Sequence, residues 1–384
     1  MSAAPSEIPR RPLTIIELCL SDGCGGLEHY AAGLVPALRE RGHRLIVVAR
    51  DGNEFAKRAG LPPTLTLRHF RFLPWHGARK LARLARKADI IHIHRSADLP
   101  LAVMAKRRAK DRPALVYTRH MLITRNRKES SAHRYMFARV DRLITITEQL
   151  EAEAQRSLPI APQRIQTLAP GVSPGARTAD CARIRPPATD FVAGCFSRIE
   201  AAKGQHELIE AVAKLRATGV NIGAVFAGPV MDADYDAEIR RRVTELDLDG
   251  PIRFLDTLAD ARPAMACCDV VVMPSSGEAL GLVLVEAMLM GVPAIGSAAG
   301  GVLEFVADGE TGLTYPVGDV DALAERLRRL AADPEYAHTL ARAGQRMASD
   351  RFDRERHLQR LEELLYNVAK ERNPASRLTP HASR

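Results

Sequence analysis

Short apolar runs alternate along this chain with longer segments whose apolar residues recur every three or four positions. The first run, at residues 13–20, precedes a glycine-containing loop, a helical pattern at residues 27–41 and a second apolar run at residues 44–49. This order is typical of a parallel sheet, because parallel strands need a long crossover connection that a helix supplies. A similar alternation resumes at residue 191. The pattern predicts an α/β protein with two Rossmann-like, doubly wound domains.

The other predicted elements follow the same periodicities. Strands are expected at residues 64–73 (strand and turn), 90–94, 114–118, 141–147, 191–196, 252–255 and 270–273, and helices at residues 75–87, 205–216, 237–245, 320–332 and 351–370. Residues 170–190 contain four prolines and two glycines without an apolar period, which is typical of a linker. We predict domains at residues 1–172 and 191–350, a linker at residues 173–190 and a disordered tail at residues 373–384.

The segment Pro274 to Pro293 combines turn chemistry, an apolar helix and two carboxylates. It follows the apolar run 270–273, and seven residues separate Glu278 in the loop from Glu286 in the helix. Burying an unpaired charge among the apolar neighbours of Glu286 costs several kcal/mol, so this glutamate should have a partner. One interpretation is a bound ligand whose hydroxyl groups donate to both carboxylates. The other is a salt bridge to a neighbouring side chain.

Two further loops carry groups suited to binding an anion. Gly25 and Gly26 precede the first helix, where backbone N–H groups can bind a phosphate or a sugar, or the glycines serve a tight turn only. The dinucleotide fingerprint G-x-G-x-x-G fails there because its third position is Glu28. Arg198 and Lys203 precede the helix 205–216, where cations and the helix dipole together can neutralise a diphosphate.

Three histidines lie on or just after predicted strands. His92 and His94 share one face of the strand 90–94, and either a cleft or a satisfied buried position would suit them. His120 follows the strand 114–118, at the end where open α/β sheets place their ligands.

Together these motifs resemble the retaining glycosyltransferases of family 4, also called glycosyl transferases group 1. The resemblance covers residues 15–350 and rests on SSGEALGLVLVEAM, GVPAI, AGGVLE and DGETGL near the C-terminal end. It implies the GT-B fold, in which two Rossmann-like domains face each other across a cleft and the last helix, here about residues 351–372, joins the first domain. The first domain then binds the acceptor, and the second binds the nucleotide-sugar donor.

The resemblance also implies a role for each candidate residue. The catalytic set is His120, Glu278, Arg198 and Lys203, and the donor-binding set is Gly25, Gly26, Arg198, Lys203, Glu278, Leu280, Gly281, Leu282 and Glu286. Arg198 and Lys203 would bind the diphosphate, Glu286 the ribose, and Glu278 with the residues after it the sugar. His120, preferred over His94, would orient the sugar or the leaving phosphate. Ala279-Leu280 replaces the family's Gly-Phe, and Asp256 replaces a glycine near the nucleobase.

Charge is divided unevenly between the two halves of the chain. Residues 1–172 contain 30 Lys and Arg against 15 Asp and Glu, a net +15, whereas the remainder contains 25 against 31, a net −6. The basic half predicts an anionic partner, either lipid head groups or a phosphorylated or lipid-linked glycan acceptor. The cationic helix 75–87 either contacts an anionic membrane or is an ordinary solvated helix. No nucleic-acid-binding motif is present, so we expect no nucleic-acid partner.

Other classes of protein are disfavoured. No charge-free window of 18 apolar residues and no signal peptide is found, and the six cysteines form no C-x-x-C pair. We therefore expect a cytoplasmic protein with reduced thiols, acting in the cytoplasm or at the inner face of the cytoplasmic membrane. No metal is expected, because the D-x-D at Asp232 and Asp234, a metal motif in another glycosyltransferase fold, precedes a helix that such acids would cap.

The expected function is transfer of a sugar from a nucleotide-diphosphate sugar to a cell-envelope glycan or glycolipid precursor, such as a lipopolysaccharide or polysaccharide. A nucleotide-sugar epimerase or a phosphorylase on a related fold is the enzymatic alternative. Isomerised sugar without an acceptor would identify the first, and dependence on orthophosphate the second. A non-catalytic sugar-nucleotide-binding protein would bind the donor without turnover.

Overall fold

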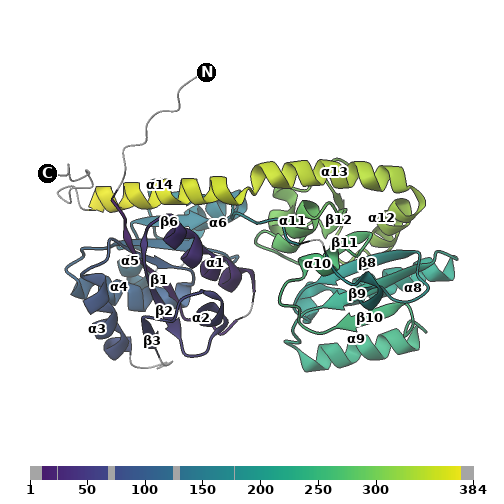
Figure 1. Cartoon of the computed structure of the whole chain (residues 1–384), viewed down its shortest axis with the longest axis horizontal. Coiled ribbons are helices and arrows are strands. Elements are labelled where there is room, and N and C mark those ends of the chain that lie inside the picture. Colours follow the sequence, from purple (N-terminus) through teal and green to yellow (C-terminus); the bar gives the residue numbers. More distant parts are fainter. Residues whose placement is uncertain (1–10, 24, 68–73, 124–129, 177, 373–384) are drawn as a thin grey trace, which may run out of the picture. The chain divides into compact units, whose positions relative to one another are not determined.

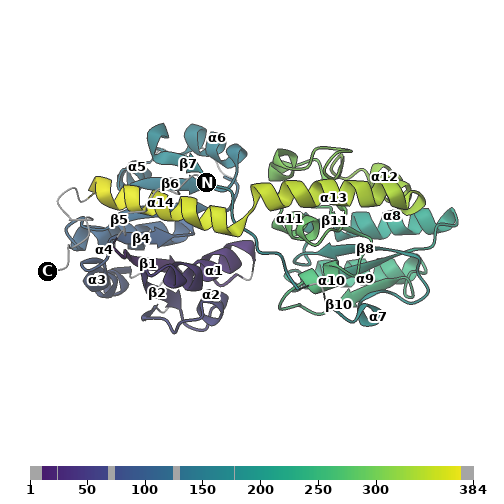
Figure 2. The same cartoon turned by 45° about the horizontal axis from the view of Figure 1, so that its top comes forward.

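The computed structural model describes residues 11–23, 25–67, 74–123, 130–176 and 178–372, with only the backbone of residues 74–76 (Figures 1 and 2). The predicted tail at residues 373–384 lies outside the described residues. The chain divides into two compact units: unit 1 comprises Met1–Pro170 and Glu355–Arg384, and unit 2 comprises Gly171–Arg354. None of the described helices is both long enough and apolar enough to cross a membrane.

Unit 1 contains a seven-stranded parallel sheet with strand order β3-β2-β1-β4-β5-β6-β7. The strands are β1 (Thr14–Cys19), β2 (Arg44–Arg50), β3 (Leu65–Leu67), β4 (Ile90–Ile93), β5 (Ala114–Arg119), β6 (Arg142–Thr145) and β7 (Ile165–Thr167). Its α-helices are α1 (Gly26–Glu40), α2 (Glu54–Arg58), α3 (Pro74–Ala85), α4 (Leu99–Arg108), α5 (Ser131–Phe137), α6 (Glu148–Ser157) and α14 (Arg354–Arg372). Strand order reverses between β1 and β4, the switch point where such sheets bind ligands.

The last helix, α14, packs onto unit 1, as both views show (Figures 1 and 2). Leu361 and Leu365 are fully buried in one cluster with Ile15 of β1 and Ile90 of β4. At the start of α14, His357 accepts a hydrogen bond from Tyr30 of α1 at 3.0 Å. The single helix predicted at residues 351–370 is in fact the end of α13 (Pro334–Arg351) and nearly all of α14.

Unit 2 contains a six-stranded parallel sheet with strand order β10-β9-β8-β11-β12-β13. The strands are β8 (Phe191–Phe196), β9 (Ile222–Ala227), β10 (Ile252–Leu255), β11 (Val270–Met273), β12 (Ala294–Ser297) and β13 (Leu313–Tyr315). Its α-helices are α7 (Cys181–Ile184), α8 (Gln205–Ala217), α9 (Ala233–Glu245), α10 (Arg262–Met265), α11 (Leu282–Leu289), α12 (Val320–Ala332) and α13. Both units thus share one strand order, and the prediction of two doubly wound sheets is confirmed.

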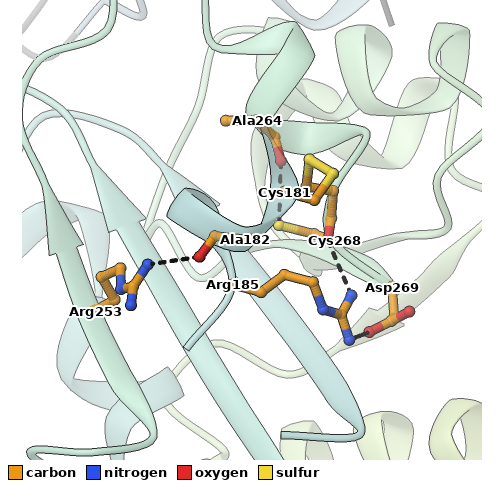
Figure 3. The surroundings of a disulfide bond; sticks show 8 residues. Cys181, Ala182, Arg185, Arg253, Ala264, Cys268 and Asp269 are labelled. Carbon is orange, nitrogen blue, oxygen red and sulfur yellow. Dashed lines mark hydrogen bonds and ion pairs between the residues drawn. A yellow bond between two sulfur atoms is a disulfide. The ribbon is translucent and has the colours of Figure 1, made fainter. Parts of the chain in front are cut away.

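A disulfide joins α7 to the body of unit 2 (Figure 3). Cys181 and Cys267 are bonded, with Cα atoms 5.3 Å apart, so the expectation that every cysteine is reduced is wrong for this pair. Cys19, Cys195 and Cys268 are free and buried, as expected of structural thiols. The pair could not be read from the sequence because 86 positions separate its members, and only the folded chain brings them together.

The surroundings of the disulfide place the predicted linker within unit 2. Arg185 donates to the Cys267 carbonyl oxygen at 3.0 Å and pairs with Asp269 at 2.9 Å, while Arg253 donates to the Ala182 carbonyl oxygen at 3.4 Å (Figure 3). The prolines and glycines of residues 173–190 indicated a free connection. These contacts fix its second half against the sheet instead.

Replacing both bonded cysteines by serine is expected to destabilise unit 2. The bond closes a long loop of the unfolded chain, and its loss should lower the free energy of unfolding by about 2–3 kcal/mol. Calorimetry should show a melting temperature several degrees lower than that of the unaltered protein without reductant. Dithiothreitol should lower the melting temperature of the unaltered protein and leave that of the double variant unchanged. Equal sensitivity of both proteins to the reductant would contradict the assignment.

Candidate functional site

The loop between β11 and α11 is shaped by one glycine. Gly281 caps α11 with φ of +88°, a left-handed conformation that favours glycine. A Cβ atom at this position would also lie 2.8 Å from the Met273 side chain at the end of β11. Leu280 is buried and Leu282 half-buried, so a contact from Leu280 to a ligand in this loop must use its backbone.

Two of the predicted residues, Lys203 and Glu278, form an ion pair. The Lys203 ammonium lies 2.5 Å from the Glu278 carboxylate, and the two side chains are only 13% and 23% exposed. The backbone supports the pair, because the Ser276 N–H donates to the carbonyl oxygen of Ala202, the residue before Lys203, at 3.1 Å. Without a ligand, each charge therefore neutralises the other.

The loop before α8 carries the second predicted cation. Arg198 pairs with Glu200 at 2.9 Å and is 41% exposed, so its guanidinium is open to solvent. Gly204 caps α8 with φ of +66°, and a Cβ atom there would overlap the Pro274 carbonyl oxygen. Because only glycine allows this approach, the loop carrying Arg198 and Lys203 lies against the loop carrying Glu278.

The side chain of Glu286 is half-buried and has no hydrogen bond or ion pair to any residue in the described part of the chain, so of the two interpretations the salt bridge to a neighbouring side chain is not found. Burial raises the pKa of its carboxyl group to about 7, although the Arg262 charge lowers it in part. Arg262 is itself held by Asp260 and the Ser173 carbonyl oxygen, both at 2.8 Å. Sequence reasoning missed both residues, because Asp260 lies just before the short helix α10, Arg262 is the first residue of that helix, and neither matches a motif.

The glycine loop of unit 1 is less open to an anion than predicted. The Gly25 N–H donates to the Glu28 carboxylate at 2.9 Å, and Glu28 is 5% exposed. This N–H is therefore already used, and a negative charge lies beside it. Gly26 is exposed at the start of α1.

His120 lies just past the carboxyl end of β5 and is half-buried. Its ring centroid is 4.9 Å from that of Tyr30, and its Nε2 is 3.4 Å from Nδ1 of His94. Burial, followed by the charge of His94, lowers the pKa of His120 well below its usual value, so the imidazole is neutral near pH 7. His92 and His94 are buried. Of the two interpretations of these histidines, a cleft or a buried position, the second is confirmed.

The acidic residues of D-x-D begin a helix. Asp232 caps α9, and its carboxylate accepts from the Tyr235 N–H at 3.1 Å. Asp234 lies in the first turn of the same helix, where acids are favoured.

Sequence comparison matches both halves of the chain to glycosyltransferases. Residues 24–175 match Glycosyltransferase Family 4, and residues 177–347 match Glycosyl transferases group 1. The lipopolysaccharide core biosynthesis glycosyltransferase LpsE of Rhizobium meliloti (strain 1021) is 29% identical over 333 residues, which are 86% of this chain and 93% of LpsE. A D-inositol 3-phosphate glycosyltransferase of Kribbella flavida is 26% identical over 370 residues, 83% of this chain and 85% of its own.

Solved structures agree in fold. Anabaena HepE, in complex with UDP and glucose, aligns with a TM-score of 0.80 and 25% identity over 92% of this chain and 99% of HepE. A glycosyltransferase of Rickettsia africae aligns with a TM-score of 0.80 and 16% identity over 94% of this chain and 99% of its own. The resemblance seen in the sequence is thereby confirmed, and the chain belongs to the group 1 and family 4 glycosyltransferases, as a nucleotide-sugar-dependent enzyme of the GT-B fold.

Proposed function

We propose that this enzyme transfers a hexose from a UDP-linked donor to a glycan or glycolipid precursor of the cell envelope, with retention at the anomeric carbon. The observation that carries the proposal is the Glu286 carboxyl group. Glu286 lies in α11, directly after the loop whose Glu278 pairs with Lys203, and its side chain has no partner among the described residues. A half-buried carboxyl group without a protein partner suits a ligand that brings hydroxyl groups.

Each residue of this site has a distinct task in the proposal. Glu286 accepts hydrogen bonds from the ribose hydroxyls, and Glu278 with the backbone at Leu280, Gly281 and Leu282 binds the donor sugar. Lys203 turns from Glu278 to the diphosphate and, with Arg198 and the N-terminus of α8, stabilises the charge of the leaving group. These cations supply the positive charge that a metal supplies elsewhere, so we propose a metal-independent reaction.

The proposed donor and acceptor follow from two relatives and from charge. HepE was solved with UDP and glucose, and LpsE is named for lipopolysaccharide core biosynthesis. In unit 1, α3 exposes Arg79, Lys80 and Arg83 on one side, which suits an anionic acceptor or the membrane surface that carries it. The acceptor is therefore proposed to be an anionic or lipid-linked glycan precursor, used at the inner face of the cytoplasmic membrane.

A thermal-shift panel of UDP, GDP, ADP and dTDP tests the donor site. A diphosphate at 100 times its Kd should add about 2.7 kcal/mol to the free energy of unfolding, and we expect UDP to give the largest shift. UMP is the matched control, because it keeps the base and the ribose but lacks the second phosphate that Lys203 and Arg198 are proposed to bind. Its shift at the same concentration should be much smaller.

The panel also separates the alternatives. A larger shift with another diphosphate would change the donor base and leave the site in place. No shift with any of the four would contradict the nucleotide site. UDP-glucose turnover that requires orthophosphate would identify a phosphorylase, and isomerised sugar without an acceptor an epimerase.

A further inference from the structure

Two arginines lie level with each other at the carboxyl ends of adjacent strands of unit 1. Arg119 is the last residue of β5. Arg95 follows β4 by two residues, and its backbone is still extended, with φ of −130° and ψ of 143°. β4 and β5 are parallel and pair Ile93 with Tyr117, and continuing this register by two residues places Arg95 opposite Arg119. Paired positions of neighbouring strands project to the same face of a sheet, so the two cations are neighbours at this edge.

The Arg119 guanidinium is buried without a carboxylate partner among the described residues. Arg119 is only 6% exposed. Its Nη1 donates to the Tyr117 hydroxyl oxygen at 3.2 Å and its Nη2 to the Leu122 carbonyl oxygen at 3.1 Å, and both acceptors are neutral. The Nε atom is itself buried and has no hydrogen-bond partner in the described structure. A buried charge is costly unless a counter-charge accompanies it, so this guanidinium lacks the anion that its position requires.

Arg95 adds a second positive charge to the same edge. It is half-buried, and its side chain has no hydrogen bond or ion pair to any residue in the described ranges. The carboxylate beside it is that of Asp98, which is buried and accepts from the Leu20 N–H at 3.2 Å. Burial raises the pKa of Asp98 to about 6, although this hydrogen bond and the Arg95 charge lower it in part. Asp98 forms an ion pair with neither arginine, so the edge keeps an excess of positive charge.

We propose that Arg119 and Arg95 bind a phosphate group of the acceptor. The inference rests on the proposed function, which makes the acceptor an anionic or lipid-linked glycan precursor, and it names the anionic group. A guanidinium donates two parallel hydrogen bonds to phosphate oxygens. A phosphate monoester carries a charge of about −1.5 to −2 at pH 7, which matches two arginines, whereas a carboxylate would leave one of them uncompensated. Both arginines belong to unit 1, so this site is complete within one unit.

The competing interpretation is that Arg119 only anchors the chain after β5 through the Leu122 carbonyl oxygen. A guanidinium has five N–H groups, and the anchor would explain the use of a few of them. It would not explain a permanent charge at a buried position, or the second cation at Arg95. The two interpretations predict opposite effects when the Arg119 charge is removed from the ligand-free protein.

Calorimetric titration with inorganic phosphate tests the site. The protein is first saturated with UDP, so that phosphate does not occupy the proposed donor site of unit 2. Arg119→Met should weaken phosphate binding at least about tenfold, the worth of one hydrogen bond to a charged group, and Arg95→Met should weaken it to a smaller extent. Arg107→Met is the matched control, because it removes the same charge from an exposed position on α4 and should leave phosphate binding unchanged. Absence of phosphate binding to the unaltered protein, or equal binding by Arg119→Met, would overturn the proposal.

Melting temperatures distinguish a ligand site from an anchor. Ligand-free Arg119→Met should melt at or above the temperature of the unaltered protein, because the variant no longer buries an unpaired charge. A markedly lower melting temperature with unchanged phosphate binding would assign Arg119 a structural role only. If Arg119→Met does not fold, Arg95→Met decides, since its half-buried position tolerates the change and unchanged phosphate binding there would contradict the site.

Two further probes identify the source of the phosphate. Glycerol 3-phosphate carries its phosphate on an organic group, as an acceptor does, and should bind through Arg119 at least as tightly as inorganic phosphate. Binding of inorganic phosphate alone would indicate a site for the free anion and overturn the acceptor assignment. Vesicles of phosphatidylglycerol should bind equally to the unaltered protein and to Arg119→Met, because a head group held in a bilayer cannot reach a buried side chain. Loss of vesicle binding in the variant would assign the site to lipid head groups instead.

The proposed function can fail independently of this inference. If the unaltered protein does not bind UDP, the donor assignment fails, and the phosphate titration is then made on Lys203→Ala, which lacks a cation of the proposed donor site. Phosphate binding that is retained in Lys203→Ala and lost in Lys203→Ala/Arg119→Met would still establish the phosphate site of unit 1. Equal binding by these two proteins would overturn it.

Discussion

Replacing Lys203 by alanine is expected to lower kcat/KM for the donor about a thousandfold, equivalent to about 4 kcal/mol of transition-state stabilisation. Two effects add in this variant. The cation proposed to neutralise the leaving diphosphate is lost, and Glu278, which Lys203 neutralises at 2.5 Å, becomes an uncompensated anion beside that diphosphate. Release of UDP from UDP-glucose, first with water alone and then with an acceptor, provides the measurement.

Lys214→Ala is the matched control for this variant. Lys214 pairs with Asp321 at the same 2.5 Å distance, but the two side chains are 49% and 82% exposed, so this pair should contribute little. The double variant Lys203→Ala/Glu278→Ala separates the two effects, because it removes the anion as well. Activity close to that of Glu278→Ala would show that Lys203 serves only to neutralise Glu278, and would contradict its assignment to the diphosphate.

The fold was accessible from the sequence because local signals agreed with each other. The predicted strands 252–255 and 270–273 and the helix 320–332 match β10, β11 and α12 residue for residue. The two strands are short, mainly apolar runs next to turn residues such as Pro251 and Pro274, and the helix has its apolar residues at helical spacing. β7, with three residues, and α4, whose apolar positions do not form a single stripe, escaped prediction because short or all-round apolar segments give no distinct period.

The candidate site was only partly accessible, because partners distant in sequence decide what a side chain does. The spacing of the two carboxylates located Glu278 and Glu286 in the sequence. Only the packing of the loops shows that Lys203 pairs with Glu278, whereas no described residue pairs with Glu286. The hydrogen bond from the Gly25 N–H to the Glu28 carboxylate likewise becomes visible only once the start of α1 is seen in three dimensions. Glu17 of β1 is fully buried and pairs with His92 and His94. It could have been found from the sequence, since it lies in the middle of an apolar strand and the argument that a buried charge needs a partner applies to it as well as to Glu286.

Glu286→Gln is expected to stabilise the ligand-free protein while weakening UDP binding about a hundredfold. In the unaltered protein, burial raises the pKa of Glu286 from 4.5 to about 7, so the unfolded chain releases this proton at a lower pH than the folded protein. The free energy of unfolding therefore falls as the pH rises from about 4.5 to about 7 and is then constant. Glutamine removes this cost, so the variant should gain about 2–3 kcal/mol at pH 8 and only about 1 kcal/mol at pH 5.5.

The weaker UDP binding of Glu286→Gln has a different cause from its higher stability, so the two measurements test the assignment of Glu286 independently. The two ribose hydroxyls lose a charged acceptor, and hydrogen bonds to charged groups are worth about 1.5–3 kcal/mol each. Urea unfolding at both pH values and calorimetric titration with UDP provide the two measurements. Glu238→Gln is the control, because this glutamate is exposed on α9 and should change neither quantity appreciably. A Glu286→Gln protein that is less stable at pH 8 would show that the carboxyl group has a structural partner and is not kept for a ligand, and unchanged UDP affinity would remove Glu286 from the donor site.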